Sequence, residues 1–530
     1  MEKIKGCFKD KYNIAFIVIL LIAILVRIVL LDKFPNGVHE DEAGMMYDAY
    51  CMAEYGTDRY LNENPVYLIN FGGGQSVLYA AIASILIKIF GLSVFVIRLP
   101  AVIFSVITII LAYILAKKYI GNKFALVLAL LITICPWHIM QSRWGLDCNL
   151  LSSFIMISVF TLLNSKKSWH FLVSGVFWGL TLYTYALSYI MLPVFFIGLC
   201  AYLLYVRKIN LKQILITIIP ILILAIPLIL LQIVNYCGLD AIKFGFLTIP
   251  KLYTYRIGEI GFENILYNLN IFNKNNVFQL LFSADHNQGN SFKEFGTIYY
   301  ILIPFAIFGF ILTIKDTIKT IKKREINLKS VFLIQFVLIF LCVLVFKDLQ
   351  LYKLNPLFIM MLAFATQAII WVYEKRKVIG ICIIVVLFIT FILFEIFYFK
   401  NVNNKVGVGF NTDFIPLIKY LDEKYPDKEI FLETDAIQQY IYLLLEKQMS
   451  PYEFIQNMEI VQFKTGETEI TRVGKYHFIF YDEIDKNMLY VVEDNNVLRG
   501  NRAEELRQKL GEQGFVEEKY NNFSIYTIKK

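Results

Sequence analysis

The sequence has little charge and few cysteines for a chain of 530 residues. Charged residues make up 18% of it and hydrophobic residues 58%, whereas soluble globular domains average roughly a quarter charged and half apolar. Because the charge is this low, a soluble enzyme and a disordered chain are excluded. The eight cysteines are scattered, without CxxC or another metal-ligand spacing. We therefore expect neither a disulfide framework nor a cysteine-based metal site.

What remains is a polytopic α-helical membrane protein. A helix needs about 18–20 mostly apolar residues to span a bilayer, and the chain holds about eleven such runs. The predicted spans are 14–31, 94–116, 124–140, 148–164, 169–187, 188–206, 213–234, 297–315, 330–346, 350–372 and 378–399. A further apolar stretch, 76–87, is shorter and is followed by Lys88. We expect this stretch to lie along the membrane surface.

The basic residues predict the orientation of these spans. Residues 1–399 hold 34 Lys and Arg against 21 Asp and Glu. If 76–87 does not cross the membrane, the basic connections between later spans fall on the side of the lysine-rich N-terminal tail. The positive-inside rule places that side in the cytoplasm. The basic surplus therefore sets topology and does not indicate nucleic-acid binding, and the C-terminus is predicted to be extracytoplasmic.

Four segments then meet on the outer face: the first loop 32–93, a short loop at 141–147, the long loop 235–296 and the tail 400–530. The tail is acidic, with 17 Lys and Arg against 22 Asp and Glu. Strand-like runs occur at 429–433, 477–481, 489–492 and 523–528, and helical stretches occur at 412–425 and 502–513. This alternation predicts an extracytoplasmic α/β domain beside a membrane domain formed by residues 1–399. The tail has no clustered triad or Gly-rich phosphate loop, so we expect an accessory domain that positions the acceptor.

The first outer loop opens with a group of acidic residues. Glu40, Asp41 and Glu42 follow His39 at the start of a predicted helix that Gly56 ends. Carboxylates at a helix N-terminus are stabilised in their ionised form. They could act as a general base or a metal ligand that faces a cavity at the membrane surface. A capped surface helix without function explains them equally well.

The short outer loop holds a second polar group. Arg143 and Asp147 lie between two spans, on the same side as Asp41. An Asp and an Arg at the membrane surface are costly unless they are used or paired. The alternative is anchoring at the interface by Trp137, Trp144 and Arg143.

These features together resemble the GT-C glycosyltransferases, and more closely their protein-mannosyltransferase-like, phospholipid-carrier-dependent branch (glycosyltransferase family 39-like). The resemblance covers the membrane part of the chain, up to the start of the tail. It is carried by Asp41-Glu42, by Arg98-Leu99-Pro100 at the start of the second span, and by Ser142-Arg143 with Asp147. The sequence departs from the family at Gly72-Gly73-Gly74-Gln75, where many relatives have a Lys-Pro-Pro run.

The resemblance implies an inverting transfer of a sugar from a polyprenyl-phosphate donor to a hydroxyl of a protein, lipid or glycan acceptor. The transfer would occur at the outer face of a prokaryotic plasma membrane, among membrane lipids. Asp41 would be the general base with Glu42 in support, and Asp147 would be the second acidic residue. A leaving phosphate needs cations. The candidate donor contacts are Arg27, Arg143, Arg256, Lys353 and Gln75.

Each cation also has an interpretation without function. Arg27 could snorkel to the interface, Arg256 could be a solvated loop charge, and Lys353 could anchor its span. No cofactor is required, although a divalent metal could take part. His138 and His286 also lie on the outer face, but no ligand spacing supports a metal site there, so structural histidines are the preferred interpretation.

Two other classes of protein compete with an enzyme. A transporter or lipid flippase usually has matching halves and charges or helix breaks at mid-membrane. Here the halves do not match, and the ionisable residues gather at the outer surface. A scaffold that binds cell-envelope partners would leave the shared placement of Asp41 and Asp147 unexplained.

Overall fold

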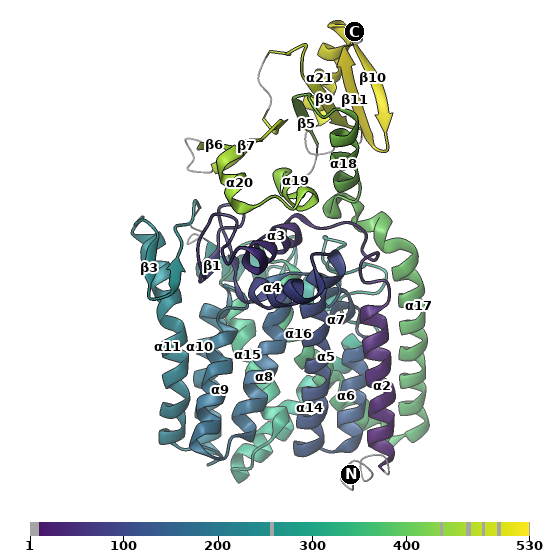
Figure 1. The fold of residues 1–530 in the computed structure, drawn as a ribbon. Coiled ribbons are helices and arrows are strands. Elements are labelled where there is room, and N and C mark those ends of the chain that lie inside the picture. Colours follow the sequence, from purple (N-terminus) through teal and green to yellow (C-terminus); the bar gives the residue numbers. More distant parts are fainter. Residues whose placement is uncertain are drawn as a thin grey trace.

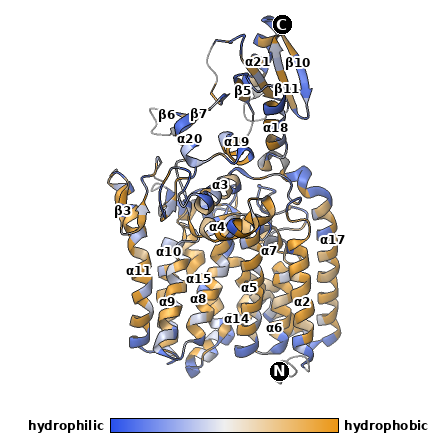
Figure 2. Ribbon diagram, in the orientation of Figure 1, coloured by the Kyte–Doolittle hydropathy of each residue, from blue (hydrophilic) through white to orange (hydrophobic). Residues whose placement is uncertain are grey.

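The computed structural model describes residues 10–254, 259–434, 438–462, 468–479, 483–494 and 500–528. Its larger part is a bundle of helices that run side by side (Figure 1). They are α2 (Lys11–Ile28), α5 (Val94–Tyr119), α6 (Asn122–Ile134), α8 (Leu151–Asn164), α9 (Ser168–Thr181), α10 (Ser188–Tyr205), α11 (Leu211–Tyr236), α14 (Leu302–Lys323), α15 (Leu328–Val343), α16 (Asn355–Lys375) and α17 (Lys377–Phe410). Figure 2 shows that hydrophobic residues dominate the bundle, whereas hydrophilic residues gather at its ends and in the C-terminal part.

The helices confirm a polytopic α-helical membrane protein. Every predicted span overlaps one of them in sequence, although several bounds differ. By length and composition, seven helices in the described part could cross a membrane, or up to eight if α14 and α15, which meet at 117°, form one broken span. The helix α6 has 13 residues and α9 has 14, fewer than a straight span needs. The predicted number of about eleven spans therefore stays a prediction.

The short apolar stretch near residue 80 forms α4 (Leu78–Phe90), which lies across the end of the bundle beneath α3 (Glu40–Glu54) (Figure 1). One face of α4 is buried through Tyr79, Ala83 and Ile87. On its other face Ile85 and Ile89 are 62% and 65% exposed. A one-sided apolar helix of this length fits a position at the membrane surface.

Other short elements lie at the same end of the bundle as α3 and α4. The strands β1 (Tyr67–Leu68) and β2 (Gln75–Ser76) pair antiparallel, as do β3 (Ile242–Phe244) and β4 (Leu247–Ile249). Short helices precede or follow the bundle helices: α7 (Pro136–Gln141), η1 (Asp147–Leu150), α12 (Asn264–Leu269), α13 (Val277–Phe282) and η3 (Leu351–Leu354). This end carries the polar residues discussed below.

The C-terminal part contains a mixed sheet, at the opposite end of the molecule from the N-terminus (Figure 1). The strand order is β10-β11-β9-β5-β8-β7-β6. Its strands are β5 (Ile430–Glu433), β6 (Met458–Gln462), β7 (Thr468–Val473), β8 (Tyr476–His477), β9 (Leu489–Glu493), β10 (Phe515–Tyr520) and β11 (Phe523–Ile528), and its helices are α18 (Phe414–Lys424), α19 (Tyr440–Lys447), α20 (Pro451–Asn457) and α21 (Gly500–Glu512). The prediction of an α/β fold is confirmed, although α19, α20, β6, β7 and β10 were not foreseen. The helix α17 runs through the predicted boundary at residues 399–400 without a break.

Candidate active site

A cavity of about 490 Å³ opens at the end of the bundle that carries α3 and α4. Its lining comes from the first loop, from the segment after α7, from the start of α10, and from the chain between α15 and α16. Asp41 and Asp147, two of the predicted catalytic carboxylates, both line it. Residues far apart in the sequence thus share one cavity at the boundary between the apolar bundle and the polar end.

Asp41 lies in the first turn of α3. The ring nitrogen Nδ1 of His39 caps this turn by accepting a hydrogen bond from the Asp41 amide at 3.2 Å. The His39 ring in turn packs against Trp144 and Phe410, with ring centroids 5.1 and 5.7 Å apart. The Asp41 side chain is 42% exposed, and no lysine or arginine in the described part pairs with it. The only charged or titratable group that pairs with its carboxylate among the described residues is His39, whose Nδ1 lies 3.8 Å from Oδ2, so the carboxylate remains open to a ligand in the cavity.

Asp147 is buried and held by backbone amides. Its Oδ2 accepts a hydrogen bond from the Ser76 amide at 3.0 Å, and its Oδ1 accepts one from the Cys148 amide at 2.8 Å. Ser76 belongs to β2 and Asp147 opens η1. Burial raises the pKa of Asp147 to about 7, and the two amide donors oppose this change. Asp147 therefore joins the first loop to the second while it faces the same cavity as Asp41.

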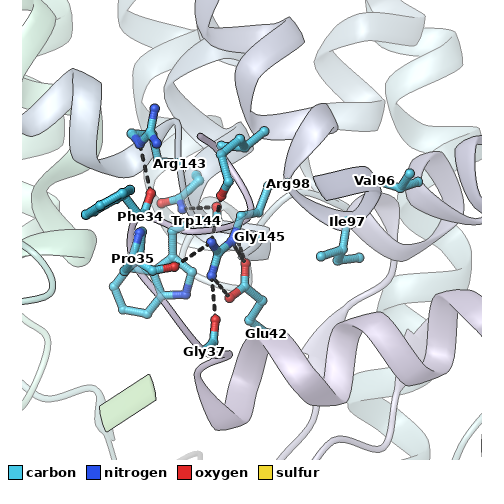
Figure 3. Close-up of polar contacts among 12 residues, drawn as sticks. Phe34, Pro35, Gly37, Glu42, Val96, Ile97, Arg98, Arg143, Trp144 and Gly145 are labelled. Atoms are coloured by element: carbon cyan, nitrogen blue, oxygen red, sulfur yellow. Dashed lines mark hydrogen bonds and ion pairs between the residues drawn. The ribbon is translucent and has the colours of Figure 1, made fainter. Parts of the chain in front are cut away.

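Glu42 does not line the cavity. Its carboxylate forms a bidentate ion pair with Arg98 of α5, at 2.8 and 2.9 Å, and it also accepts the Gly145 amide at 2.8 Å (Figure 3). Both side chains of the ion pair are fully buried. Arg98 further donates to the carbonyls of Leu31, Pro35 and Gly37. The described contacts make Glu42 a structural link beside Asp41, and its predicted supporting role in catalysis stays a prediction.

Burial shifts the pKa values of two other titratable groups at this turn, Glu40 and His39. Burial, with a contribution from neighbouring Asp41, raises the pKa of Glu40 to about 7. Burial also lowers the pKa of His39, although Asp41 and Glu42 oppose the change. Near neutral pH, Glu40 is thus partly protonated and His39 is neutral.

Two predicted phosphate ligands lie away from the cavity. Arg143 donates to the Phe34 carbonyl (Figure 3) and to the carbonyls of Val26, Val29 and Leu30, so it caps the end of α2. Its guanidinium also packs on Tyr398 and Phe399. A guanidinium that donates to several carbonyls has few donors left for a ligand. The predicted role of Arg143 in donor binding stays a prediction.

Arg27 is likewise engaged inside the bundle. It donates to the carbonyls of Ala23 and Thr133 and lies 2.8 Å from Nδ1 of His138. Arg27 and His138 are buried, and Arg27 is not part of the cavity lining. Its predicted role in donor binding stays a prediction, and His138 has a structural partner. His286 contacts Gln279. The described residues contain no group of three or more His, Cys, Asp or Glu that could hold a metal.

Lys353 is the one lysine or arginine among the described residues that line the cavity. It lies in η3, and its Nζ donates to the Lys347 carbonyl at 2.8 Å and lies 4.0 Å from Oε2 of Glu259. Arg256, the remaining predicted cation, lies outside the described residues. Trp137 and Trp144, considered as interfacial anchors, are buried, with 2% and 4% of their surface exposed.

Gln75 lines the cavity from the β1–β2 hairpin, where its Oε1 accepts a hydrogen bond from Asn70 at 2.6 Å. The turn of this hairpin needs glycine. Gly74 has a φ of 82°, and a Cβ there would lie 2.5 Å from the Tyr67 ring. The glycine run that departs from the family pattern therefore builds a tight turn that brings Gln75 to the cavity wall.

Several lining residues were missed by the sequence analysis. They include Tyr67, Asn70, Glu259, Asp348, Gln350 and Tyr352. They come from loops and short elements without a recognisable motif, so no local pattern singles them out. Glu259 and Asp348 give the cavity more carboxylates than the sequence suggested.

Comparison with known proteins finds one matching family model and several similar solved structures. The model of a family described as dolichyl-phosphate-mannose-protein mannosyltransferase matches residues 75–231, whereas no curated protein matches. The chain is similar in structure to ArnT from Cupriavidus metallidurans bound to undecaprenyl phosphate, with a TM-score of 0.54 and 11% identity over 96% of this chain and 97% of that one. It is also similar to the Archaeoglobus fulgidus oligosaccharyltransferase in complex with Zn and sulfate, with a TM-score of 0.53 and 11% identity over 82% of this chain and 61% of that one. At this level of identity the likeness establishes a shared fold.

Proposed function

We propose that this chain, a protein-mannosyltransferase-like protein with the GT-C fold, moves a sugar from a polyprenyl-phosphate donor to an acceptor hydroxyl. One observation carries the proposal: Asp41, Asp147 and Lys353 line a single cavity at the end of an apolar bundle. A base, a second acid and a cation are the groups that such a transfer needs.

The location of the cavity suits a lipid-linked donor. A polyprenyl chain stays in the bilayer, so its phosphate and sugar lie at the membrane surface. The cavity combines apolar walls, including Leu187, Ile190 and Leu231, with polar groups that can bind a phosphate and a sugar. The similar ArnT structure was solved with undecaprenyl phosphate bound, which supports a donor of this class here.

Asp41 is the proposed general base. Its carboxylate takes the proton of the acceptor hydroxyl as that oxygen attacks the anomeric carbon of the sugar. The bond from the anomeric carbon to the phosphate oxygen breaks, and its electron pair leaves with the polyprenyl phosphate. Attack from the face opposite the phosphate inverts the anomeric centre. The exposure of Asp41, and the absence of an ion pair with any described lysine or arginine, support this assignment.

Lys353 is the proposed cation for the leaving phosphate. Negative charge develops on the phosphate oxygen as the bond breaks, and a fixed ammonium lowers the energy of that state. The family pattern would offer a lysine from the first loop, where this chain has Gly72-Gly73-Gly74. Lys353 reaches the cavity from a different loop and could fulfil the same need. Asp147 then orients the acceptor or contributes to binding a divalent cation.

The proposal is tested with purified protein and a panel of polyprenyl-phosphate hexoses and pentoses, with released polyprenyl phosphate detected by mass spectrometry. At least one donor should be consumed in the presence of a lipid, peptide or glycan acceptor. The Asp41→Asn variant should lose about a hundredfold to ten-thousandfold in rate, because an amide cannot take the proton. Asp32→Asn, in an exposed part of the same loop, is the matched control.

Two outcomes would contradict the proposal. Wild-type turnover in Asp41→Asn would remove Asp41 from the mechanism. Consumption of none of the donors would contradict glycosyl transfer itself. For Asp147→Asn we expect a smaller loss of rate than for Asp41→Asn, and unchanged activity would leave Asp147 only its hydrogen bonds to Ser76 and Cys148.

A further inference from the structure

We infer that the C-terminal domain positions Asp41, and that Tyr442 is the positioning residue through which it does so. This inference rests on the proposed role of Asp41. It assigns the domain a task in the reaction itself, beyond the accessory role of holding an acceptor. Tyr442 lies in α19, which packs on α3 at the end of the bundle (Figure 1).

The hydroxyl of Tyr442 bonds the chain immediately before α3. The side chain is fully buried, and its Oη donates to the Val38 carbonyl at 3.0 Å. Oη also accepts a hydrogen bond from Nδ2 of Asn411 at 2.6 Å. Burial raises the pKa of this hydroxyl far above its ordinary value, so the proton stays on the oxygen and points to Val38.

The backbone amide of Val38 is also hydrogen-bonded to the C-terminal part of the chain. It donates to the Phe410 carbonyl at 2.7 Å, so the C-terminal part of the chain binds both polar backbone groups of Val38. The approach is close: a Cβ on Gly37 would lie 2.2 Å from the Phe410 carbonyl oxygen. Only a glycine, here with a φ of 80°, lets the two strands of chain come so near.

The clamped segment determines where Asp41 points. Val38 leads into His39, whose ring caps the first turn of α3 and packs between Trp144 and Phe410. The dihedral angles of this short connection fix the first turn and so the direction of the Asp41 carboxylate. A displacement of about 1 Å at a reacting group can lower a rate about a hundredfold. Freeing the Val38 carbonyl should therefore affect the reaction without any change in the cavity residues.

The same interface offers a matched control. Tyr47 of α3 is also fully buried, and its hydroxyl donates to the Met449 carbonyl at 2.9 Å. Tyr442→Phe and Tyr47→Phe each remove one hydroxyl that joins α3 or its approach to the C-terminal domain. Only the first of them touches the segment before Asp41.

The first measurement is amide hydrogen exchange in the full-length protein, which needs no activity. Peptides that cover residues 37–45 should exchange roughly tenfold faster in Tyr442→Phe, because local opening of the clamp becomes easier. The same peptides should be unchanged in Tyr47→Phe. Asn411→Gly, which keeps the left-handed backbone at φ 44° and removes the amide that holds Oη, should give an intermediate increase. Unchanged exchange in Tyr442→Phe would overturn the inference.

The second measurement is the rate of donor consumption. We expect kcat to fall about tenfold or more in Tyr442→Phe while the donor KM stays within about twofold, since the binding residues are intact. Tyr47→Phe should keep kcat within about twofold of the wild type. Equal losses in the two variants, or faster exchange without loss of kcat, would overturn the positioning role. A wild-type protein that consumes no donor would instead contradict the proposed function, and the exchange data would still decide whether the clamp exists.

Discussion

Arg98 and Glu42 form a bidentate ion pair in which Nε–Oε1 and Nη2–Oε2 are 2.8 and 2.9 Å apart and neither side chain is exposed. The pair joins α5 to α3. Through the Gly145 amide it also joins the first outer loop to the second. This arrangement fixes the position of Glu42 in α3. Asp41, the residue before it, is thereby held at the cavity, while its own side chain stays open to it.

Glu42→Gln should destabilise the protein. The substitution leaves the Arg98 charge buried without its carboxylate, and breaking a buried pair in this way costs about 3–5 kcal/mol. Thermal unfolding in detergent should show a clear fall in Tm. Glu63→Gln, which breaks an exposed pair with Lys243, should leave Tm unchanged. If Glu42→Gln kept the wild-type Tm but lost activity, Glu42 would act in the chemistry as the sequence first suggested.

The fold could be predicted from the sequence because each bundle helix is marked by its own apolar run. The short stretch that became α4 was separable from the spans by its length and by Lys88. The shared side of Asp41 and Asp147 followed from topology alone, and both line one cavity. Their roles in catalysis stay predictions.

The contacts of individual side chains could not be predicted in this way. Arg27 and Arg143 are of the residue type that commonly binds phosphate. Tertiary packing nevertheless directs both side chains onto backbone carbonyls at helix ends. Glu42 and Asp41 are neighbours in the sequence, yet successive residues of a helix point in different directions, so one meets Arg98 and the other the cavity. Tyr442 lies far along the chain in a helix that no motif marks.

Lys353→Met should slow the transfer. Removing a single group that stabilises a developing anion costs about a hundredfold to a thousandfold in kcat. Lys353→Arg should restore part of the rate, because it keeps the charge. Lys251→Met, which removes a half-exposed lysine of the long outer loop, is the control and should be as active as the wild type. Equal activity of Lys353→Met and Lys251→Met would exclude Lys353 as the phosphate ligand.

The stability of the protein should fall as the pH rises towards neutrality, in part because of Glu40. Its pKa is raised from 4.5 to about 7 in the folded state, chiefly by burial. The folded protein therefore holds a proton that the unfolded chain releases. Below the pKa of the unfolded chain, Glu40 does not lower the free energy of unfolding. Between the two pKa values it lowers that free energy progressively, by about 1–3 kcal/mol at the upper end.

Glu40→Gln tests this cause directly. The glutamine cannot ionise, so the variant should lose less stability than the wild type between about pH 5 and pH 8. Glu54→Gln, at the exposed end of the same helix, should keep the wild-type pH dependence. Thermal unfolding across this range gives the comparison. Parallel curves for Glu40→Gln and the wild type would show that Glu40 is not the group responsible.

The orientation in the membrane can be tested by cysteine labelling on intact cells. The positive-inside rule predicts that Ile120, after α5, faces the cytoplasm and that the first loop around Tyr60 faces outward.

Because Tyr60 packs against Tyr253 and Phe454, the exposed Glu63 is the better site in that loop. The exposed Cys237 and Cys382 are first replaced by alanine to remove background labelling. A membrane-impermeant maleimide should then label Glu63→Cys from outside, and label Ile120→Cys only after the cells are opened. Labelling of Ile120→Cys in intact cells would contradict the predicted orientation of α5 and with it the predicted side of every later loop.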